Sequence, residues 1–220
     1  MDPKVAQIAQ RLSLLLSNRP AEAGIHAAAS RAEPSVGSQL ASLATAPSAG
    51  GGSRLVGEAH ALKGLGSLRE KRERQGADVE IRDGLRYTIV LAGMNFTNRV
   101  IHIADSLRGS GYRCTRMNTT EGKRGWERGY IGVNSNWSTS EGTIFELQFH
   151  TELSWHAKSA SHGAYEVWRE DSSNPIKRAA NTSKFQECFN SGATSLGVEA
   201  WKLDGVGSDL DKWFASQGRP

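Results

Sequence analysis

The chain has 220 residues, of which 38% are hydrophobic, and it carries a formal net charge of +4 at pH 7. This length allows one domain with a core plus tails, and the modest positive charge suits a phosphate-rich ligand or nucleic acid without choosing between them. No apolar run reaches the roughly 18 residues of a membrane span. The 2 cysteines lack a CxxC spacing, which argues against a disulfide framework or a zinc site and makes a reduced, cytosolic site of action the default.

Residues 1–53 are predicted to form a disordered leader with one weak amphipathic helix at its start. From about Asn18 to Ser53 the sequence is mostly Ala, Ser, Gly and Pro. Such a segment buries too little apolar surface to offset the entropy lost on ordering. A leader of this kind is compatible with export by a secretion machine, or with binding to a secretion chaperone. An ordinary disordered tail explains it equally well.

The folded domain is expected over residues 54–190, and a C-terminal extension over 191–220 either docks as a short helix or remains loose. Hydrophobic periodicity and turn signals predict the elements in chain order. They are a loop and a charged helix within 55–75, a strand within 79–91, a helix over 98–112, strands over 112–120, 130–138 and 143–151, and a helix over 152–170. This order indicates an α+β domain, a mixed β-sheet with flanking helices.

Lys63, Ser67 and Lys71 recur every four residues around the start of the charged helix. This spacing places them on roughly one helix face. A glycine-containing turn before a helix can hold a polyphosphate through backbone N–H groups and nearby cations. On this stretch alone a solvated basic helix is the simpler interpretation, and the spacing is not that of a Walker A loop.

Asp83 and Glu146 are carboxylates within otherwise apolar strand-like segments. A buried carboxylate is costly unless it is paired or bound to a metal. One Asp and one Glu from adjacent strands can hold Mg²⁺, which keeps several waters and takes few protein ligands. Glu146, Gln148 and His150 alternate along their strand and therefore share one face. A fully exposed sheet face, and a surface carboxylate at a strand entrance, are the alternatives.

Tyr130 lies between a strand and a basic loop that contains Lys123 and Arg124. The loop can grip a phosphate and the ring can stack on a base, although a solvated loop and a packed aromatic ring explain the same residues. His156 and His162 are six residues apart and would not share a helix face as the histidines of a zinc motif do.

Taken in order, these segments resemble the synthetase domain of the RelA/SpoT superfamily, whose members transfer the β,γ-pyrophosphate of ATP to a 3′-hydroxyl and make (p)ppGpp. The resemblance covers about residues 54–170. It rests on "ALKGLGSLREK" for the pattern R-x-K-x-x-x-S-x-x-x-K, on "RDGLRYTIVL" for an Asp before a strand, on "GYIGVNS" for "GYQSLHT", and on "ELQFHT" for "EVQIRT". It implies a nucleotidyltransferase-like fold, ATP as the donor substrate and Mg²⁺ as the cofactor.

The resemblance also implies roles for single residues. Asp83 and Glu146 would hold Mg²⁺, and Glu146 would help to deprotonate the attacking hydroxyl. The ATP would be bound by Lys63, Ser67, Lys71 and Arg86. The acceptor would be bound by Tyr130, Asn134, Gln148, His150, Lys123 and Arg124.

Three segments depart from the family pattern. Ala61 stands where the first segment begins with an arginine, "GVN" at residues 132–134 replaces "SLH" of the third so that Asn134 takes the place of a histidine, and His150 replaces the arginine of the fourth. All three are expected on the nucleotide-facing surface, so the acceptor is left open between a guanine nucleotide, an adenine nucleotide and a tRNA 3′ end. The missing cation can be replaced by Arg54, Arg69 or Arg86.

Two functions of different classes follow from the sequence. The first is an Mg²⁺-dependent pyrophosphokinase that works in a cytoplasm, including that of a host or target cell if the protein is a secreted toxin or effector. The second is a catalytically inactive domain that binds nucleotide, RNA or a host protein, which Ala61 and the altered third segment favour. A surface-polar α+β domain of unrelated function is the third alternative, and the oligomeric state carries no sequence signal.

Overall fold

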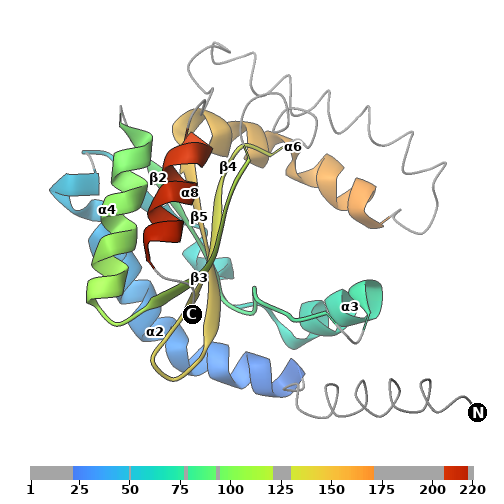
Figure 1. The fold of residues 1–220 in the computed structure, drawn as a ribbon. Coiled ribbons are helices and arrows are strands. Elements are labelled where there is room, and N and C mark those ends of the chain that lie inside the picture. The colour runs from blue at the N-terminus through green and yellow to red at the C-terminus, as the bar shows by residue number, and fades with distance from the viewer. Residues whose placement is uncertain are drawn as a thin grey trace, which may run out of the picture.

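The computed structural model describes residues 22–49, 51–76, 79–92, 95–120, 130–170 and 206–217. These residues form a five-stranded sheet with the strand order β1-β2-β5-β4-β3 (Figure 1). The strands are β1 Arg54–Val56, β2 Arg86–Leu91, β3 Arg113–Thr120, β4 Gly132–Ser138 and β5 Ile144–Thr151. The predicted α+β class with a mixed sheet and flanking helices is confirmed.

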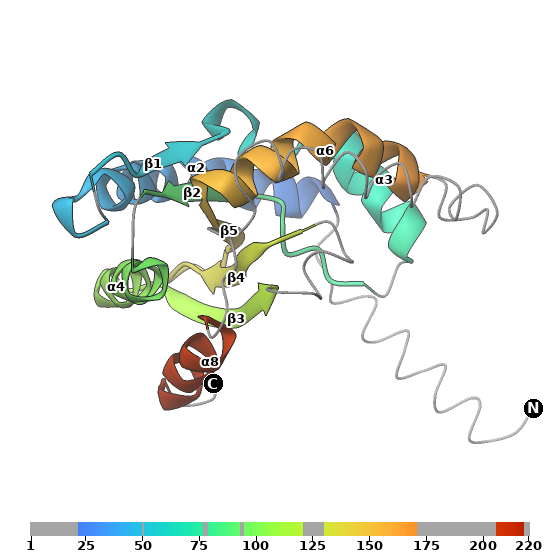
Figure 2. The same cartoon turned by 90° about the horizontal axis from the view of Figure 1, so that it is seen from above.

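Five α-helices accompany the sheet in the described ranges. They are α2 Glu22–Thr45, α3 Leu65–Gln75, α4 Phe96–Gly109, α6 Glu152–Glu170 and α8 Val206–Ser216. Helices α2, α4 and α8 lie on one side of the sheet, while α6 and α3 lie on the other (Figure 1; Figure 2). In the described part of the chain, no helix combines the length and the hydropathy needed to cross a membrane.

The central strands β2 and β5 are parallel, and the remaining neighbours in the sheet are antiparallel. Arg86 lies opposite Glu146 and Thr88 lies opposite Gln148 in the β2–β5 pair. Asn134 of β4 lies opposite Gln148 from the other side. Because directly paired residues point to the same face, polar side chains from three strands meet on one face of the sheet.

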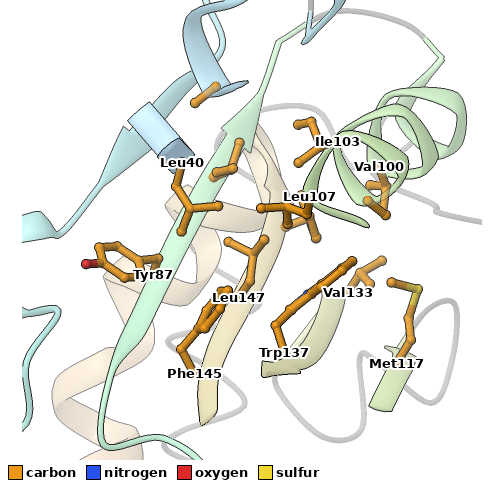
Figure 3. Packing of buried hydrophobic residues seen from close by; sticks show 14 of the residues in the cluster. Leu40, Tyr87, Val100, Ile103, Leu107, Met117, Val133, Trp137, Phe145 and Leu147 are labelled. Atoms are coloured by element: carbon orange, nitrogen blue, oxygen red, sulfur yellow. The ribbon is translucent and has the colours of Figure 1, made fainter. Parts of the chain in front are cut away.

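The opposite face of the sheet is apolar and carries the core, as Figure 3 shows. Alternate residues of β5 and β4 point into it, and α4 supplies a matching stripe one helical turn apart. Its members include Leu40, Tyr87, Val100, Ile103, Leu107, Trp137, Phe145 and Leu147, of which Tyr87 is 2% exposed and the others are completely buried. Burying each large side chain contributes about 1.5–3 kcal/mol, so this layer is the main source of stability.

Helix α2 corrects the prediction of a disordered leader for residues 22–45. The helix packs against β1 and β2, and Tyr87 donates a hydrogen bond from its hydroxyl to the Glu33 carbonyl oxygen at 3.1 Å. Its buried stripe is mostly alanine and comprises Ala29, Ala32, Val36, Leu40 and Ala44. Small side chains let the helix backbone lie close to the sheet, so a segment with few large apolar residues can still pack against it. The domain therefore begins before residue 54, and the weak helix predicted near the start of the chain lies outside the described residues.

Part of the C-terminal extension docks as a short helix, which is one of the two predicted alternatives. Residues 206–216 form α8, which packs on β3 and α4. Leu210 is fully buried, and Trp213 donates from its indole Nε1 to Asp105 Oδ1 at 2.9 Å. The apolar positions of the helix thus cover the outer strand of the sheet on its core side (Figure 2).

Candidate active site

Asp83 is held between two lysines. Lys63 Nζ lies 2.5 Å from Asp83 Oδ2, and Lys71 Nζ donates to Oδ1. The Asp83 side chain is only 10% exposed, so its charge is largely withdrawn from water. The carboxylate that the sequence singles out is therefore buried and paired, as the cost of an isolated buried charge requires.

The backbone explains how these residues meet. Asp83 does not lie within a strand as predicted, because β2 begins at Arg86 and residues 80–83 are irregular, with a bend at Gly84. The segment before α3 pairs with this stretch: Lys63 N donates to Gly84 O at 2.9 Å, and Arg86 N donates to Ala61 O at 2.9 Å. This short bridge places Lys63 next to Asp83, and Lys71 reaches the same carboxylate from two turns into the helix.

The electrostatics of the cluster keep Asp83 ionised. Burial raises the pKa of the Asp83 carboxyl, but the charges and hydrogen bonds of Lys63 and Lys71 outweigh it and hold the pKa at about 2. Burial also lowers the pKa of Lys63, although Asp83 opposes that shift. The lysine thus carries a desolvation cost, which a second anion near its ammonium group would reduce.

A cavity of about 290 Å³ opens beside this cluster. Its lining residues are Ala59, His60, Ala61, Leu62, Lys63, Gly64, Ser67, Asp83 and Arg86. Three of the four residues predicted to bind ATP therefore share one cavity with the predicted catalytic Asp83. The fourth, Lys71, contacts Asp83 directly.

Arg86 is placed to replace the cation missing at Ala61. Both residues line the cavity, and the Arg86 charge lies close enough to lower the pKa of Lys63. Arg54 instead pairs with Glu152, with Nη2 2.9 Å from Oε2, and Arg69 is not among the cavity residues. Of the three arginines that the sequence offers, the geometry selects Arg86.

A second polar cluster occupies the face of β5 that carries Glu146. Gln148 Nε2 donates to Glu146 Oε1 at 2.6 Å, and Lys158 Nζ of α6 donates to Gln148 Oε1 at 2.6 Å. Gln148 is 5% exposed because α6 covers it, so the alternative of a fully exposed polar sheet face is wrong. Lys158 is not among the predicted site residues. In the sequence it is a lone lysine on an amphipathic helix, four residues after Ser154 and therefore on the same face, and only the structure shows that this face is buried.

Tyr130 and His150 pack against each other. Their ring centroids are 5.2 Å apart in an edge-to-face arrangement, and His150 Nδ1 lies 3.0 Å from Ser154 Oγ. Burial lowers the pKa of His150 well below its usual value, so the imidazole is neutral. His150 is fully buried in this structure, and its role in lining the acceptor pocket stays a prediction. Its ring is enclosed because α6 follows β5 immediately and brings Ser154 and Trp155 over it.

The remaining predicted acceptor residues fall into two groups. Asn134 is half-buried on β4 and shares the polar face with Gln148. The Tyr130 hydroxyl is buried and has no hydrogen-bond partner among the described residues, while nearby Glu146 and Arg86 both influence its pKa, which burial raises. Lys123 and Arg124 lie outside the described residues.

The donor set of the site suits the Mg²⁺ that the resemblance implies. Asp83 and Glu146 offer hard carboxylate oxygens, and Mg²⁺ is held by one or two carboxylates together with substrate phosphates. Glu146 Oε2 accepts no hydrogen bond from any described residue. Both oxygens of Asp83 accept a hydrogen bond from an ammonium group, so a cation that binds Asp83 would compete with Lys63 and Lys71 for this carboxylate. No cluster of three or more His, Cys, Asp or Glu side chains occurs in the part of the chain that the structure describes.

Comparison with solved structures defines the class of fold. The chain aligns with the Type VI effector Tas1, solved in complex with its immunity protein, at 21% identity over 77% of this chain and 95% of that chain, with a TM-score of 0.50. It also aligns with small alarmone synthetase 2 from Bacillus subtilis, at 14% identity over 79% of this chain and 95% of that chain, with a TM-score of 0.52. The protein therefore has a RelA/SpoT-like synthetase fold, as the sequence resemblance predicts. No protein-family model matches the chain, and no curated protein matches it.

Proposed function

We propose that this protein is an Mg²⁺-dependent pyrophosphokinase that transfers the pyrophosphate of ATP to the 3′-hydroxyl of a nucleotide or of a tRNA end. One observation carries the proposal. Lys63, Ser67, Asp83 and Arg86 line one cavity, in a fold shared with a small alarmone synthetase. The sequence resemblance assigns Lys63, Ser67 and Arg86 to the donor nucleotide and Asp83 to the metal.

The donor side of the site is rich in cations. Lys63, Lys71 and Arg86 surround the single carboxylate of Asp83, so the cluster has an excess of positive charge. A triphosphate would offset that charge and would compete with Asp83 for the two ammonium groups. The first backbone N–H groups of α3 follow Gly64 at the wall of the cavity and add hydrogen-bond donors for phosphate oxygens.

The metal would be held by Asp83 and Glu146. When bound, Mg²⁺ would neutralise phosphate charge and orient the transferred group. Release of Lys63 and Lys71 to the phosphates would free Asp83 for this role. The same exchange would give every charge in the cavity a partner after ATP binds, whereas without ATP Arg86 forms no salt bridge with any described residue.

The transfer itself is an in-line displacement at phosphorus. The acceptor 3′-oxygen forms a bond to the β-phosphorus of ATP, the bond from that phosphorus to the α,β-bridging oxygen breaks, and AMP leaves. Glu146 takes the proton of the attacking hydroxyl, and its Oε2 is free to do so. The protein contributes mainly positioning and charge stabilisation, as in other phosphoryl transfers.

The acceptor side would be formed by Tyr130, Asn134 and Gln148, with Lys123 and Arg124 as phosphate ligands. The likeness to an effector that was solved with its immunity protein supports a role as a toxin exported into the cytoplasm of a target cell. In that role the partners would be a secretion apparatus or its chaperone, a neutralising protein in the producing cell, and the acceptor.

The test is a transfer assay with γ-labelled ATP and Mg²⁺, supplied separately with GDP, GTP, ADP, ATP and deacylated tRNA. We expect labelled product with at least one acceptor, and no product from Asp83→Ala or Glu146→Ala. Asp209→Ala, at a largely exposed position of α8, is the matched carboxylate control and should behave as wild type.

The second candidate is an inactive domain that binds nucleotide, and the observation that favours it is the buried Ala61 in the cavity wall. Nucleotide binding without transfer would support this candidate. Absence of both binding and transfer would refute both candidates.

A further inference from the structure

Lys158 of α6 points toward the sheet although it is a charged residue of a helix. Its Nζ lies 2.6 Å from Gln148 Oε1 and 4.8 Å from the centroid of the Trp155 ring. Lysine is rarely withdrawn from water in this way unless its ammonium group is paired. Here the direct partner is a neutral amide, and the nearest carboxylate, Glu146, lies one hydrogen bond further on.

The contact dictates how the Gln148 amide is oriented. An ammonium group can only donate hydrogen bonds, so it must face the oxygen of the carboxamide. The nitrogen end is then turned to Glu146, where Nε2 donates to Oε1 at 2.6 Å. With the amide reversed, its oxygen would face the Glu146 carboxylate and its NH₂ group would face the Lys158 ammonium. Both contacts would be repulsive, so Lys158 and Glu146 together select one orientation.

The chain of contacts also fixes the carboxylate. Gln148 occupies Oε1 of Glu146, while Oε2 accepts no hydrogen bond from any described residue. The groups that face Lys158 come from three elements: Arg86 of β2, Glu146 and Gln148 of β5, and Trp155 of α6 itself. Burial and Arg86 lower the pKa of Lys158 to about 8, against the opposing effect of Glu146, so the ammonium form still predominates at pH 7.

We propose that Lys158 is a positioning residue of the active site: it locks the Gln148 amide, and through it directs one oxygen of Glu146 away from the acceptor and leaves the other for the acceptor hydroxyl. This inference rests on the proposed function. Lys158 is not required to touch either substrate, so its loss should slow the transfer step more than it weakens the binding of ATP.

The kinetic test compares Lys158→Met with Lys158→Arg. We expect the methionine variant to lose about tenfold or more in kcat, with KM for ATP changed less than about twofold, and the arginine variant to recover most of the loss. Gln148→Leu should resemble Lys158→Met, and the double variant should be no slower than either single variant, because the two residues act as one unit. Lys212→Met, which removes a lysine that is 78% exposed on α8, is the matched control.

A merely structural role for Lys158 would instead lower the thermal unfolding temperature of Lys158→Met, and Lys158→Arg would not restore kcat. If Lys158→Met fails to fold, Lys158→Gln should show the same loss of kcat, because a glutamine amide can donate or accept and therefore selects neither orientation of Gln148.

A second readout does not depend on activity. The side-chain NH₂ resonances of Gln148, assigned in ¹⁵N-labelled protein by their loss in Gln148→Leu, should be shifted and well separated in the wild type. In Lys158→Met they should move toward the values of a freely rotating glutamine. Unchanged resonances in Lys158→Met, or a kcat equal to that of Lys212→Met, would overturn the inference while leaving the proposed function intact. If the wild type transfers nothing to any acceptor, the proposed function fails, and the resonances alone decide whether Lys158 orients Gln148.

Discussion

The imidazole of His150 fills the space beside Gly132 in which a side chain at that position would have to begin. A Cβ built on Gly132 would lie 2.8 Å from His150 Cε1 and 2.8 Å from the Phe149 carbonyl oxygen. Gly132 stands where the segment "GYQSLHT" has a serine, and His150 stands where "EVQIRT" has an arginine. Gly132 and His150, which look like independent departures from the family pattern in the sequence, are therefore in direct contact and depend on each other for packing. The ring of Tyr130 packs against the same His150.

Gly132→Ser should destabilise the protein by about 1–3 kcal/mol, because the added atoms overpack a fully buried ring and a strand backbone. Urea unfolding measures the effect. Gly109→Ala, at the end of α4 where an added Cβ meets nothing within 4 Å, should change the free energy of unfolding by less than about 0.5 kcal/mol. Combining Gly132→Ala with His150→Ala should recover only part of the loss, since the contact with the Phe149 carbonyl oxygen persists. Full stability of Gly132→Ser would show that the strand can shift away.

Asp83 should make the protein sensitive to acid. Its pKa is lowered from 3.8 to about 2 in the folded state, because the two lysines outweigh the effect of burial, so its stabilising contribution is complete above pH 3.8 and is lost as the pH falls toward 2. The contribution is about 2 kcal/mol at most, and the buried Lys63 offsets part of it. Free energies of unfolding measured between pH 5 and pH 2 should fall more steeply for wild type than for Asp83→Asn. Asp209→Asn, at an exposed position, should retain the wild-type slope; equal slopes for both variants would contradict the prediction.

Arg86 should contribute more to ATP binding than Arg54 does. Arg86 lines the cavity, whereas Arg54 pairs with Glu152 at a site where both side chains are nearly half exposed. Loss of a charge-assisted contact weakens binding by roughly tenfold or more, so Arg86→Ala should raise the Kd for ATP by that factor, while Arg54→Ala changes it little. Calorimetry with α,β-methylene-ATP, in which the bond to be broken is blocked, measures binding without turnover. A larger effect of Arg54→Ala would show that Arg54 of β1, and not Arg86 of β2, replaces the cation missing at Ala61.

The contact between Trp213 and Asp105 should anchor α8. Trp213→Phe removes the indole donor but keeps most of the ring, and should cost about 1 kcal/mol. Trp213→Ala also opens a cavity beside β3, so about 3–5 kcal/mol is expected. Chemical denaturation followed by far-UV circular dichroism tests both variants. Lys212→Ala, one residue away and exposed, serves as the control, and equal stability of Trp213→Ala and this control would show that α8 adds nothing to the fold.

Strands β2 to β5 and the amphipathic helices α4 and α6 could be predicted from the sequence because their apolar residues repeat with a clear period, whereas β1 has only three residues and begins a segment predicted as a loop. Helix α2 could not be predicted, because most of its buried residues are alanine. Alanine adds little to the hydrophobic periodicity by which an amphipathic helix is recognised in a sequence. The pairing of Asp83 with Lys63 and Lys71 depends on a backbone bridge between segments twenty residues apart, which no local pattern encodes. Lys158 was missed for a similar reason: a single lysine on a helix is usually solvated, and only the position of α6 over β5 turns it inward.

The strand order has a consequence for how the protein becomes active. One half of the site, around Lys63 and Asp83, belongs to the segment that ends in β2, and the other half, around Glu146 and Gln148, belongs to the β4–β5 hairpin and α6. The backbones of the two halves pair through the parallel strands β2 and β5, whose partners are 60 positions apart, and such long-range parallel pairing forms late and slowly. Each half can assemble locally on a nascent or refolding chain without approaching the other. The proposed transfer activity should therefore recover with the slowest refolding phase, so that a newly made chain gains it only once the complete tertiary structure has formed.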